Sequence, residues 1–307
     1  MSAITQTLRL VETFRNLFYT PVYVAVGGGF LYAEGLDVQF STVPAGGSAI
    51  DMLRSGAADI AQTGVSRTLV DLDAGHDDAP LHIAEINQRD GFFLLGHDSV
   101  DDWGWSHLEN ATLIPVGFTP VPWMPLRGAL LKNGVDVVSI TLIEGLSAEA
   151  AMERFRAGGA DYIHLPHPQA QMIVDEGSGH IAVAIGPELG YLCYSSFAAA
   201  PGYLDSRPDV VQRFVQGFGN ALRWLSDADT EAVARRVSPF FPDLPEQLLR
   251  SAIGQYRSQA TWPDDPVIGE EGFTGMRDLL IDGGLVAVSH AYELVVRPEY
   301  ALRTRDG

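Results

Sequence analysis

One short pattern occurs in two distant parts of the chain, and it constrains the fold more than any other feature. Residues 51–64 are DMLRSGAADIAQTG, and residues 153–166 are ERFRAGGADYIHLP. In both segments an Arg is followed two positions later by a Gly, and then by Ala-Asp and two apolar residues. The corresponding residues are Arg54, Gly56 and Asp59 in the first copy and Arg156, Gly158 and Asp161 in the second.

The residues around the first copy predict a β-α-β unit. Apolar and polar residues alternate over 36–43, which indicates a strand. Ser48 can cap the helix that follows, and Gly56 can end it. A second, buried strand is then expected over 59–64.

The second copy predicts the same unit. We expect a strand over 135–143, a helix over 147–157 that ends at Gly158, and a strand over 161–166. Such units place their strands parallel, with a right-handed crossover. Two of them predict two α/β lobes of similar design.

The flanking segments add elements to both lobes. Further strands are expected at 8–14, 80–87, 111–118 and 180–186, and further helices at 21–35, 68–75 and 123–134. The apolar period becomes helical after residue 208, and 208–228 predicts a long amphipathic helix. The expected order is therefore two α/β lobes followed by a helical tail.

Composition limits the class of partner. The chain has 307 residues, of which 46% are hydrophobic, so two lobes with substantial cores are expected. The net charge of −19 argues against a nucleic-acid partner, because phosphate binding needs concentrated positive charge. The single cysteine, Cys193, excludes an internal disulfide.

The start of the chain bears on where the protein works. MSAITQTLRLVETF has no basic segment followed by an apolar one, as an export signal would. No stretch reaches the roughly 18 apolar residues of a membrane span, so no membrane insertion is expected. We expect a cytoplasmic protein from the chain as printed, and a periplasmic or extracellular one if an export signal was removed.

Two runs of sequence resemble a known family. YVAVGGGFLYAEGLDVQF at 23–40, followed by AGGSAIDMLRSGAADIA at 45–61, resembles the start of type II periplasmic-binding-protein folds. The run is similar to the branch that holds nitrate-, taurine- and alkanesulfonate-binding proteins and thiamine-pyrimidine synthase-like proteins. That branch commonly has a helix ending in Gly, then an aromatic residue and E-G-L-D-V, as at Gly29, Phe30 and 34–38 here.

The resemblance implies an architecture and a function. It implies a two-lobed α/β fold with two crossing strands, near 92–97 and 192–199, and a helical C-terminal tail packed on lobe 1. Lobe 1 would comprise 1–95 plus 200–307, and lobe 2 would comprise 96–199. The implied function is that of a small-molecule solute-binding protein of ABC-transporter receptor type. Its ligand would lie in the interlobe cleft, and an ABC permease would be its partner if the protein is exported.

Loops at the carboxyl ends of the strands supply the candidate site. AGGS at 45–48 and TGVS at 63–66 place backbone N–H groups and a hydroxyl at a helix start, which suits an anionic oxygen, although the two serines could serve only as caps. Aromatic residues in loop 14–20 suit a flat ligand. We expect Phe14 in the core and Arg67 on the surface. The predicted ligand-binding residues are Arg15, Asn16, Tyr19, Gly46, Gly47, Ser48, Gly64, Ser66, Arg89, Phe118, Thr119 and His164.

The alternative is a cytoplasmic enzyme on the same scaffold, a lyase or hydrolase that acts on an aromatic acid or a pyrimidine-like substrate. Glu85 or Asp90 with His164 could form an acid–base pair, but no catalytic residue is assigned. Cys193 lies in an apolar run, which predicts an inert buried thiol. In the thiamine-pyrimidine relatives a His often occurs where Tyr19 stands, which disfavours a pyrimidine.

No metal or cofactor is expected. The segment HLPHP places His164 and His167 three residues apart, but prolines interrupt any helix there and no third ligand is evident. The chain also lacks a Walker motif, a dinucleotide-binding motif and a G-x-S-x-G motif.

Overall fold

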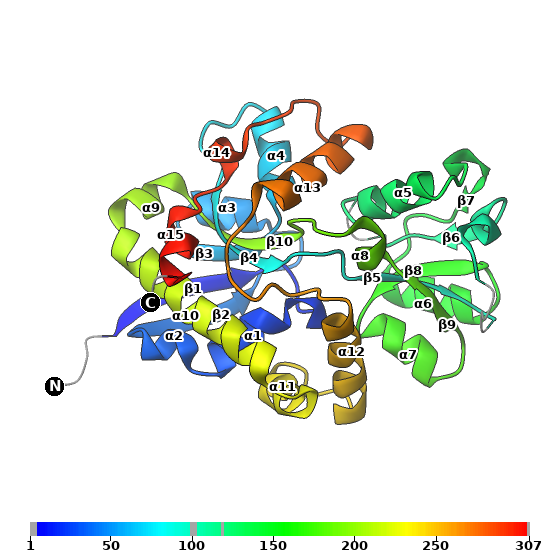
Figure 1. Cartoon of the computed structure of the whole chain (residues 1–307), viewed down its shortest axis with the longest axis horizontal. Coiled ribbons are helices and arrows are strands. Elements are labelled where there is room, and N and C mark those ends of the chain that lie inside the picture. The colour runs from blue at the N-terminus through cyan, green and yellow to red at the C-terminus, as the bar shows by residue number, and fades with distance from the viewer. Residues whose placement is uncertain (1–4, 99–102, 118–119, 306–307) are drawn as a thin grey trace.

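The computed structural model describes residues 5–98, 103–117 and 120–305, which form two α/β lobes, each built on a five-stranded sheet (Figure 1). The first sheet contains β1 (Gln6–Glu12), β2 (Leu36–Thr42), β3 (Ile60–Thr63), β4 (Leu81–Asn87) and β10 (Ser195–Ala199). The second sheet contains β5 (Phe92–Gly96), β6 (Thr112–Ile114), β7 (Thr141–Leu142), β8 (Tyr162–Pro166) and β9 (His180–Ala184).

Helices cover both sheets. They are α1 (Thr20–Gly27), α2 (Phe30–Ala33), α3 (Ala49–Arg54), α4 (Val65–Asp73), α5 (Trp123–Lys132), α6 (Ala148–Arg156), α7 (Gln169–Asp175), α8 (Ile185–Leu189), α9 (Pro201–Ser206), α10 (Pro208–Asp227), α11 (Thr230–Val237), α12 (Glu246–Ser258), α13 (Glu270–Asp282), α14 (Tyr292–Val295) and α15 (Glu299–Leu302). Across the part of the chain that the structure describes, no helix combines the length and apolar character needed to cross a membrane.

The two sheets have the same topology. Their strand orders are β2-β1-β3-β10-β4 and β7-β6-β8-β5-β9. In the first, β2 and β3 flank β1 and run parallel to it, and in the second β7 and β8 flank β6 in the same way. The fourth strand of each sheet, β10 or β5, is antiparallel to its neighbours. The predicted pair of similar lobes is confirmed.

The repeated pattern has the same local structure in both copies. The Ser48 side chain accepts a hydrogen bond from the Asp51 N–H at the start of α3, and Ser147 accepts one from the Ala150 N–H at the start of α6. Each helix then ends at a left-handed glycine, Gly56 or Gly158, with φ of +71° or +72°. The repeat is therefore structural, because the same cap and the same glycine turn deliver the chain into β3 and β8.

Two connections join the sheets. The chain passes from β4 to β5 through residues 88–91, and it returns from α8 to β10 through residues 190–194. All of β5 pairs within the second sheet and all of β10 within the first. The division into lobes after residues 95 and 199 remains a prediction.

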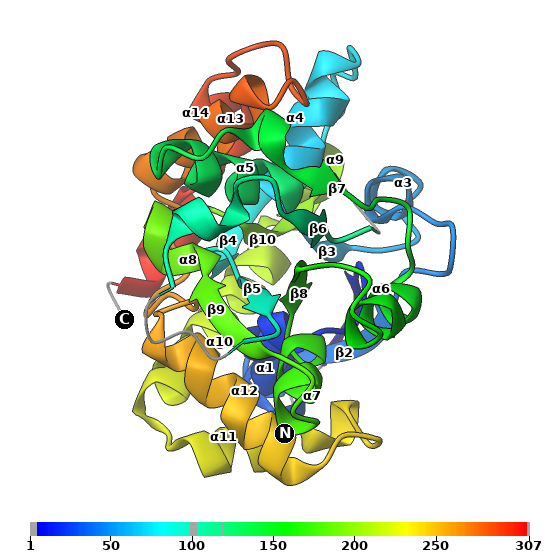
Figure 2. The ribbon, with the colours of Figure 1, turned by 90° about the vertical axis from the view of Figure 1, so that its right-hand side faces the viewer.

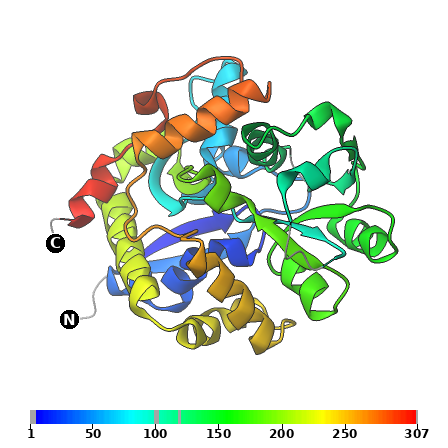
Figure 3. The ribbon, with the colours of Figure 1, turned by 45° about the vertical axis from the view of Figure 1, so that its right-hand side comes forward.

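The C-terminal helices pack on the first lobe, as expected. Figure 3 shows the yellow helix α10 and the red end of the chain beside the blue strands. Phe197 of β10 lies edge-on to Phe214 and Phe218 of α10, with ring centroids 4.8 Å apart in both pairs. All three side chains are buried, and each contributes about 1.5–3 kcal/mol of hydrophobic stabilisation. This aromatic contact fixes the tail to the sheet.

One tail helix also reaches the second lobe. Helix α12 lies beside α7 (Figure 2), and the amide of Gln255 donates a 2.7 Å hydrogen bond to the side-chain oxygen of Gln171. The Tyr256 hydroxyl accepts a hydrogen bond from the His167 N–H at 3.0 Å. The tail thus contributes to the contact between lobes.

Three predicted elements need correction. The helix expected over 21–35 is two helices, α1 and α2, because Gly29 adopts φ of +76° between them. The strand expected over 135–143 is a 3-10 turn at Val137–Ser139 followed by the two residues of β7. There the Asp136 carboxylate accepts the Val138 N–H at 3.0 Å, which closes a turn in place of a strand. The helix expected over 68–75 begins earlier, at Val65.

Candidate functional site

Two adjoining cavities lie where the carboxyl ends of the strands of the two sheets face each other. The large cavity has a volume of about 400 Å³, and the small cavity has a volume of about 50 Å³. Thr13, Phe14 and Arg67 line both cavities, so the two spaces adjoin at these residues. This is the place where open α/β sheets bind ligands.

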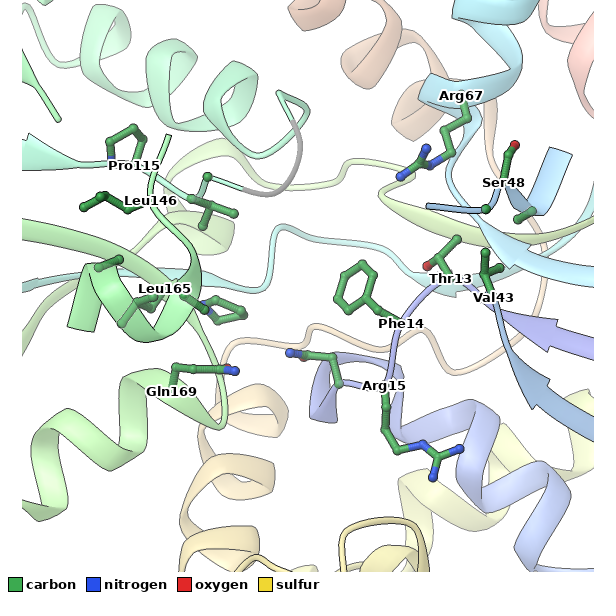
Figure 4. Close-up of a pocket in the computed structure, with 18 residues that line it drawn as sticks. Thr13, Phe14, Arg15, Val43, Ser48, Arg67, Pro115, Leu146, Leu165 and Gln169 are labelled. Carbon is green, nitrogen blue, oxygen red and sulfur yellow. The ribbon is translucent and has the colours of Figure 1, made fainter. Parts of the chain in front are cut away.

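Both lobes line the large cavity (Figure 4). The first lobe contributes residues 13–16, Val43, residues 47–49 and Arg67, which follow β1 and β2 or begin α3 and α4. The second lobe contributes residues 115–117, Leu146, Ala148, Ala151, Leu165, Pro166 and Gln169, which follow β6 or lie around α6, β8 and the start of α7. Most of these side chains are apolar, so the large cavity suits an apolar body.

The small cavity lies at the first turn of α4. Its lining includes Gly64 and Ser66 there, Tyr194 from the connection that leads into β10, and Ser195 at the start of β10 itself. Gly64 is the N-cap residue and has no capping side chain, so the first N–H groups of this nine-residue helix receive no side-chain cap.

Two hydroxyl groups in the lining of the small cavity have no partner. The Thr63 and Tyr194 side chains are only 1% and 7% exposed. Neither hydroxyl has a hydrogen-bond partner within the described part of the chain. Burial raises the pKa of Tyr194 well above its ordinary value, so its phenol stays protonated and can donate a hydrogen bond.

Arg67 and Arg15 point in different directions (Figure 4). The Arg67 guanidinium is directed toward the cavity and forms no ion pair or hydrogen bond with any residue that the structure describes. Arg15 turns away, and its Nε donates to the buried carboxylate of Glu12 at 2.9 Å. The Arg15 guanidinium also lies over the rings of Phe40 and Phe240. Arg67, expected on the surface, is exposed but borders the cavity.

The structure brings seven of the predicted residues to the cavities. Those at the large cavity are Arg15, Asn16, Gly47 and Ser48, and those at the small cavity are Tyr19, Gly64 and Ser66. Tyr19 is buried against Phe14 and Phe18, with both ring-centroid distances at 5.4 Å. Burial raises the pKa of Tyr19 to about 12, so its hydroxyl is also neutral.

Three other predicted residues lie outside both linings. Gly46 occupies a left-handed turn position with φ of +76°, and Arg89 is half-buried in the connection after β4. His164 is fully buried on β8, where its ring contacts Phe92 at a centroid distance of 5.1 Å. Burial lowers the pKa of His164 to about 3. Phe118 and Thr119 lie outside the described residues.

Sequence reasoning missed several lining residues. Phe14, expected in the core, lines both cavities, and Thr13, Gln169 and Leu165 were not considered. Thr13 directly follows β1, Leu165 lies near the end of β8 and Gln169 begins α7. Their position at strand ends and helix starts could have indicated that they line the cavity, whereas their residue types alone could not.

The only thiol lies away from the site. Cys193 is fully buried and lines neither cavity. Burial, together with the nearby Glu85, raises the pKa of the Cys193 thiol well above its ordinary value. The reactive thiolate is therefore disfavoured at neutral pH.

Known proteins resemble this chain in sequence and in fold. YtlA of Bacillus subtilis (strain 168), named as a binding protein, is 27% identical over 296 residues, which is 96% of this chain and 88% of YtlA. The alkanesulfonate-binding protein SsuA from Xanthomonas axonopodis pv. citri, solved bound to MOPS, superimposes with a TM-score of 0.72 at 18% identity, covering 96% of this chain and 99% of that one. The nitrate-binding protein NrtA from Synechocystis PCC 6803 gives 0.67 at 13% identity, covering 98% and 89%.

The fold is thus the two-lobed type II periplasmic-binding-protein fold, as the resemblance implied. Residues 10–238 match a single family, and that match spans most of the described structure, from β1 to the end of α11. The chain belongs to the NMT1-like family.

Proposed function

We propose that the protein is a solute-binding protein of ABC-transporter receptor type that holds a small anionic or aromatic organic molecule in its interlobe cleft. One observation carries the proposal: the large cavity is lined from both lobes, and in the part of the chain that the structure describes only the connections 88–91 and 190–194 run between the two sheets. A ligand in that position contacts both lobes at once. Its binding energy therefore favours the arrangement in which the lobes are closed.

The size and chemistry of the cavity support a small organic ligand. A volume of about 400 Å³ lies within the range of small-molecule sites, which combine apolar walls with a few polar groups. The names of YtlA, SsuA and NrtA describe binding proteins, and the last two name alkanesulfonate and nitrate as ligands. An ABC permease as partner is part of the proposal.

The composition of the site favours binding over chemistry. Among the described residues that line the two cavities there is no Cys, His, Asp or Glu. The acid–base pair considered for an enzyme, Glu85 or Asp90 with His164, is buried outside both linings. A lyase or hydrolase would need a proton-transfer group or nucleophile within reach of its substrate.

Native mass spectrometry of freshly purified protein tests the proposal. We expect a bound small molecule whose mass disappears on denaturation. Small-angle scattering should then show a smaller radius of gyration when that molecule is added back to stripped protein. A Cys193→Ala variant should bind it with unchanged affinity. Turnover of the molecule by the wild type, lost in that variant while folding is preserved, would favour the enzyme instead.

A further inference from the structure

We propose that the ligand is an organic monoanion with an uncharged apolar body, held with its anionic head in the small cavity and its body in the large one. The inference rests on the proposed function and narrows it. It excludes two classes of ligand for this chain: small inorganic anions, and zwitterions such as amino acids and aminosulfonates.

The charges at the site set the charge of the ligand. Arg67 lines both cavities and its guanidinium pairs with no described residue, whereas Arg15 is neutralised by Glu12. No acidic side chain is present among the described lining residues. One anionic group would therefore find a counter-charge, but a ligand ammonium would lose its hydration without gaining one. A monoanion fits, and a zwitterion does not.

The small cavity is built for an oxyanion. Helix α4 presents its first N–H groups there without a side-chain cap. A helix start attracts negative oxygens, since its N–H groups and dipole both favour them. The buried hydroxyls of Thr63 and Tyr194 have no hydrogen-bond partner in the described part of the chain, and leaving such a group unpaired costs about 1–3 kcal/mol. A carboxylate or sulfonate in the small cavity would accept hydrogen bonds from both hydroxyls.

The large cavity accommodates the apolar body of the ligand. Its walls include Phe14, Val43, Leu146 and Leu165, and its volume of about 400 Å³ far exceeds that of nitrate. Apolar surface removed from water contributes about 25 cal/mol per Å², so an aromatic or branched aliphatic body gains affinity that an inorganic ion cannot. The side chain of Gln169 points toward the same space (Figure 4) and can hydrogen-bond one polar substituent.

A matched set of probes tests the class of ligand by titration calorimetry on full-length protein stripped of ligand. The probes are 3-phenylpropanoate, phenylmethanesulfonate, L-phenylalanine, 3-phenylpropanamide and nitrate. L-Phenylalanine differs from 3-phenylpropanoate only by its ammonium group, and the amide differs only by its lost charge. We expect at least one of the two aromatic anions to bind, about tenfold or more tightly than any of the other three. The better of the two identifies the head group.

Other results would overturn the inference. These are no binding by either aromatic anion, or equal binding of L-phenylalanine, the amide or nitrate. Native mass spectrometry separates this failure from that of the proposed function. A bound zwitterion, neutral molecule or inorganic ion would leave a solute-binding protein with a different ligand. No bound or bindable small molecule at all would contradict the proposed function itself.

Variants locate the head group with the aromatic anion that binds. Thr63→Val and Tyr194→Phe should each weaken binding by about fivefold or more, and Arg67→Gln by about tenfold. The first two should not lower the midpoint of thermal unfolding, because the lost hydroxyls have no hydrogen-bond partner among the described residues. Arg250→Gln, on the exposed side of α12, is the charge-matched control. Unchanged affinity in both hydroxyl variants would show that the anionic head group does not bind in the small cavity.

Discussion

Asp59 and Asp161 make the same backbone contact in the two sheets. The Asp59 carboxylate accepts the Arg9 N–H at 2.7 Å, and the Asp59 N–H donates to the Arg9 carbonyl at 2.9 Å. The Asp161 carboxylate likewise accepts the Thr112 N–H at 2.7 Å, and its own N–H donates to the Thr112 carbonyl at 3.1 Å. Asp59 thus joins the start of β3 to β1, and Asp161 joins the start of β8 to β6. The repeated Asp has a structural purpose, which is to set strand pairing in each lobe.

Asp161→Ala should lower the free energy of unfolding by about 1–3 kcal/mol, because the variant loses hydrogen bonds to the N–H and the hydroxyl of Thr112. Those bonds lower the pKa of Asp161, so the stabilisation is complete above the unfolded-state pKa of about 4 and is lost as the pH falls through the lower folded-state pKa. Urea unfolding at pH 7 and at pH 3 measures both effects. Asp77→Ala, at an exposed loop position, is the control, and equal losses in the two variants would contradict this role.

Gly158→Ala and Gly56→Ala should each destabilise the protein by about 1–2 kcal/mol. Both glycines adopt positive φ, and an added Cβ at either would meet no atom within 4 Å, so backbone strain accounts for the whole effect. Gly254→Ala inside α12 is the matched control. It meets equally open space at an ordinary helical φ, and should stabilise the helix by about 0.5–1 kcal/mol. Thermal unfolding of the three variants should show opposite signs.

Local signals explain which parts of the fold could be predicted. A serine cap and a glycine end fix α3 and α6 by hydrogen bonds within a few residues, and both helices were predicted to within two residues of their ends. The segment 135–143 has the β-branched residues of a strand, but only two of its residues pair. Strand formation depends on a partner far away in the chain, and that partner is not visible in local sequence.

Side-chain direction explains which parts of the site could not be predicted. Arg15 was expected at the cleft and Arg67 on the surface, yet the buried carboxylate of Glu12 turns Arg15 away, while Arg67, in the first turn of α4, has no such partner among the described residues. The position of the His164 side chain is also set by distant residues. This residue lies on the central strand β8 and packs against Phe92, which lines the small cavity while His164 does not. Both outcomes depend on non-local packing.

His164→Leu should stabilise the protein in mild acid. Burial lowers the pKa of His164 to about 3, and neither ring nitrogen has a partner among the described residues. The unfolded chain takes up a proton near pH 6.5 and the folded protein does not, so wild-type stability falls as the pH drops from about 6.5 toward 3. At pH 5 this group accounts for about 2 kcal/mol of lost stability.

Urea unfolding at pH 5 and pH 7.5 measures that difference. The gain from His164→Leu should be larger at pH 5 by about 2 kcal/mol. His180→Leu, at an exposed position at the start of β9, is the control substitution. A gain that does not change with pH would mean that packing, and not proton uptake, explains it.

Asp90→Asn should act with the opposite pH dependence. Burial raises the pKa of Asp90 to about 8, and its carboxyl accepts the Phe92 N–H at 2.7 Å, which an Asn side chain can also accept. The folded protein keeps this proton while the unfolded chain loses it above about pH 4, so wild-type stability falls by up to about 1.4 kcal/mol per unit as the pH rises from 4 toward 8. The stability of the Asp90→Asn variant should not show this decrease between pH 4 and 8. Identical slopes in wild type and variant would show that Asp90 ionises freely when folded.

Phe14→Ala should weaken ligand binding by about 1–3 kcal/mol, the usual effect of removing one well-packed aromatic anchor. Phe14 is half-buried, lines both cavities and packs edge-on against Tyr19 at 5.4 Å. It is a sharper probe than Tyr19, since truncating the buried Tyr19 would also disturb the core. Calorimetry with the aromatic anion that binds, or with the co-purified solute, gives the dissociation constant. Tyr32→Ala, an aromatic truncation at a side chain 68% exposed, is the control. If the Phe14→Ala and Tyr32→Ala variants bind the ligand equally well, the ligand does not contact Phe14. The two cavities that Phe14 lines are then not its binding site.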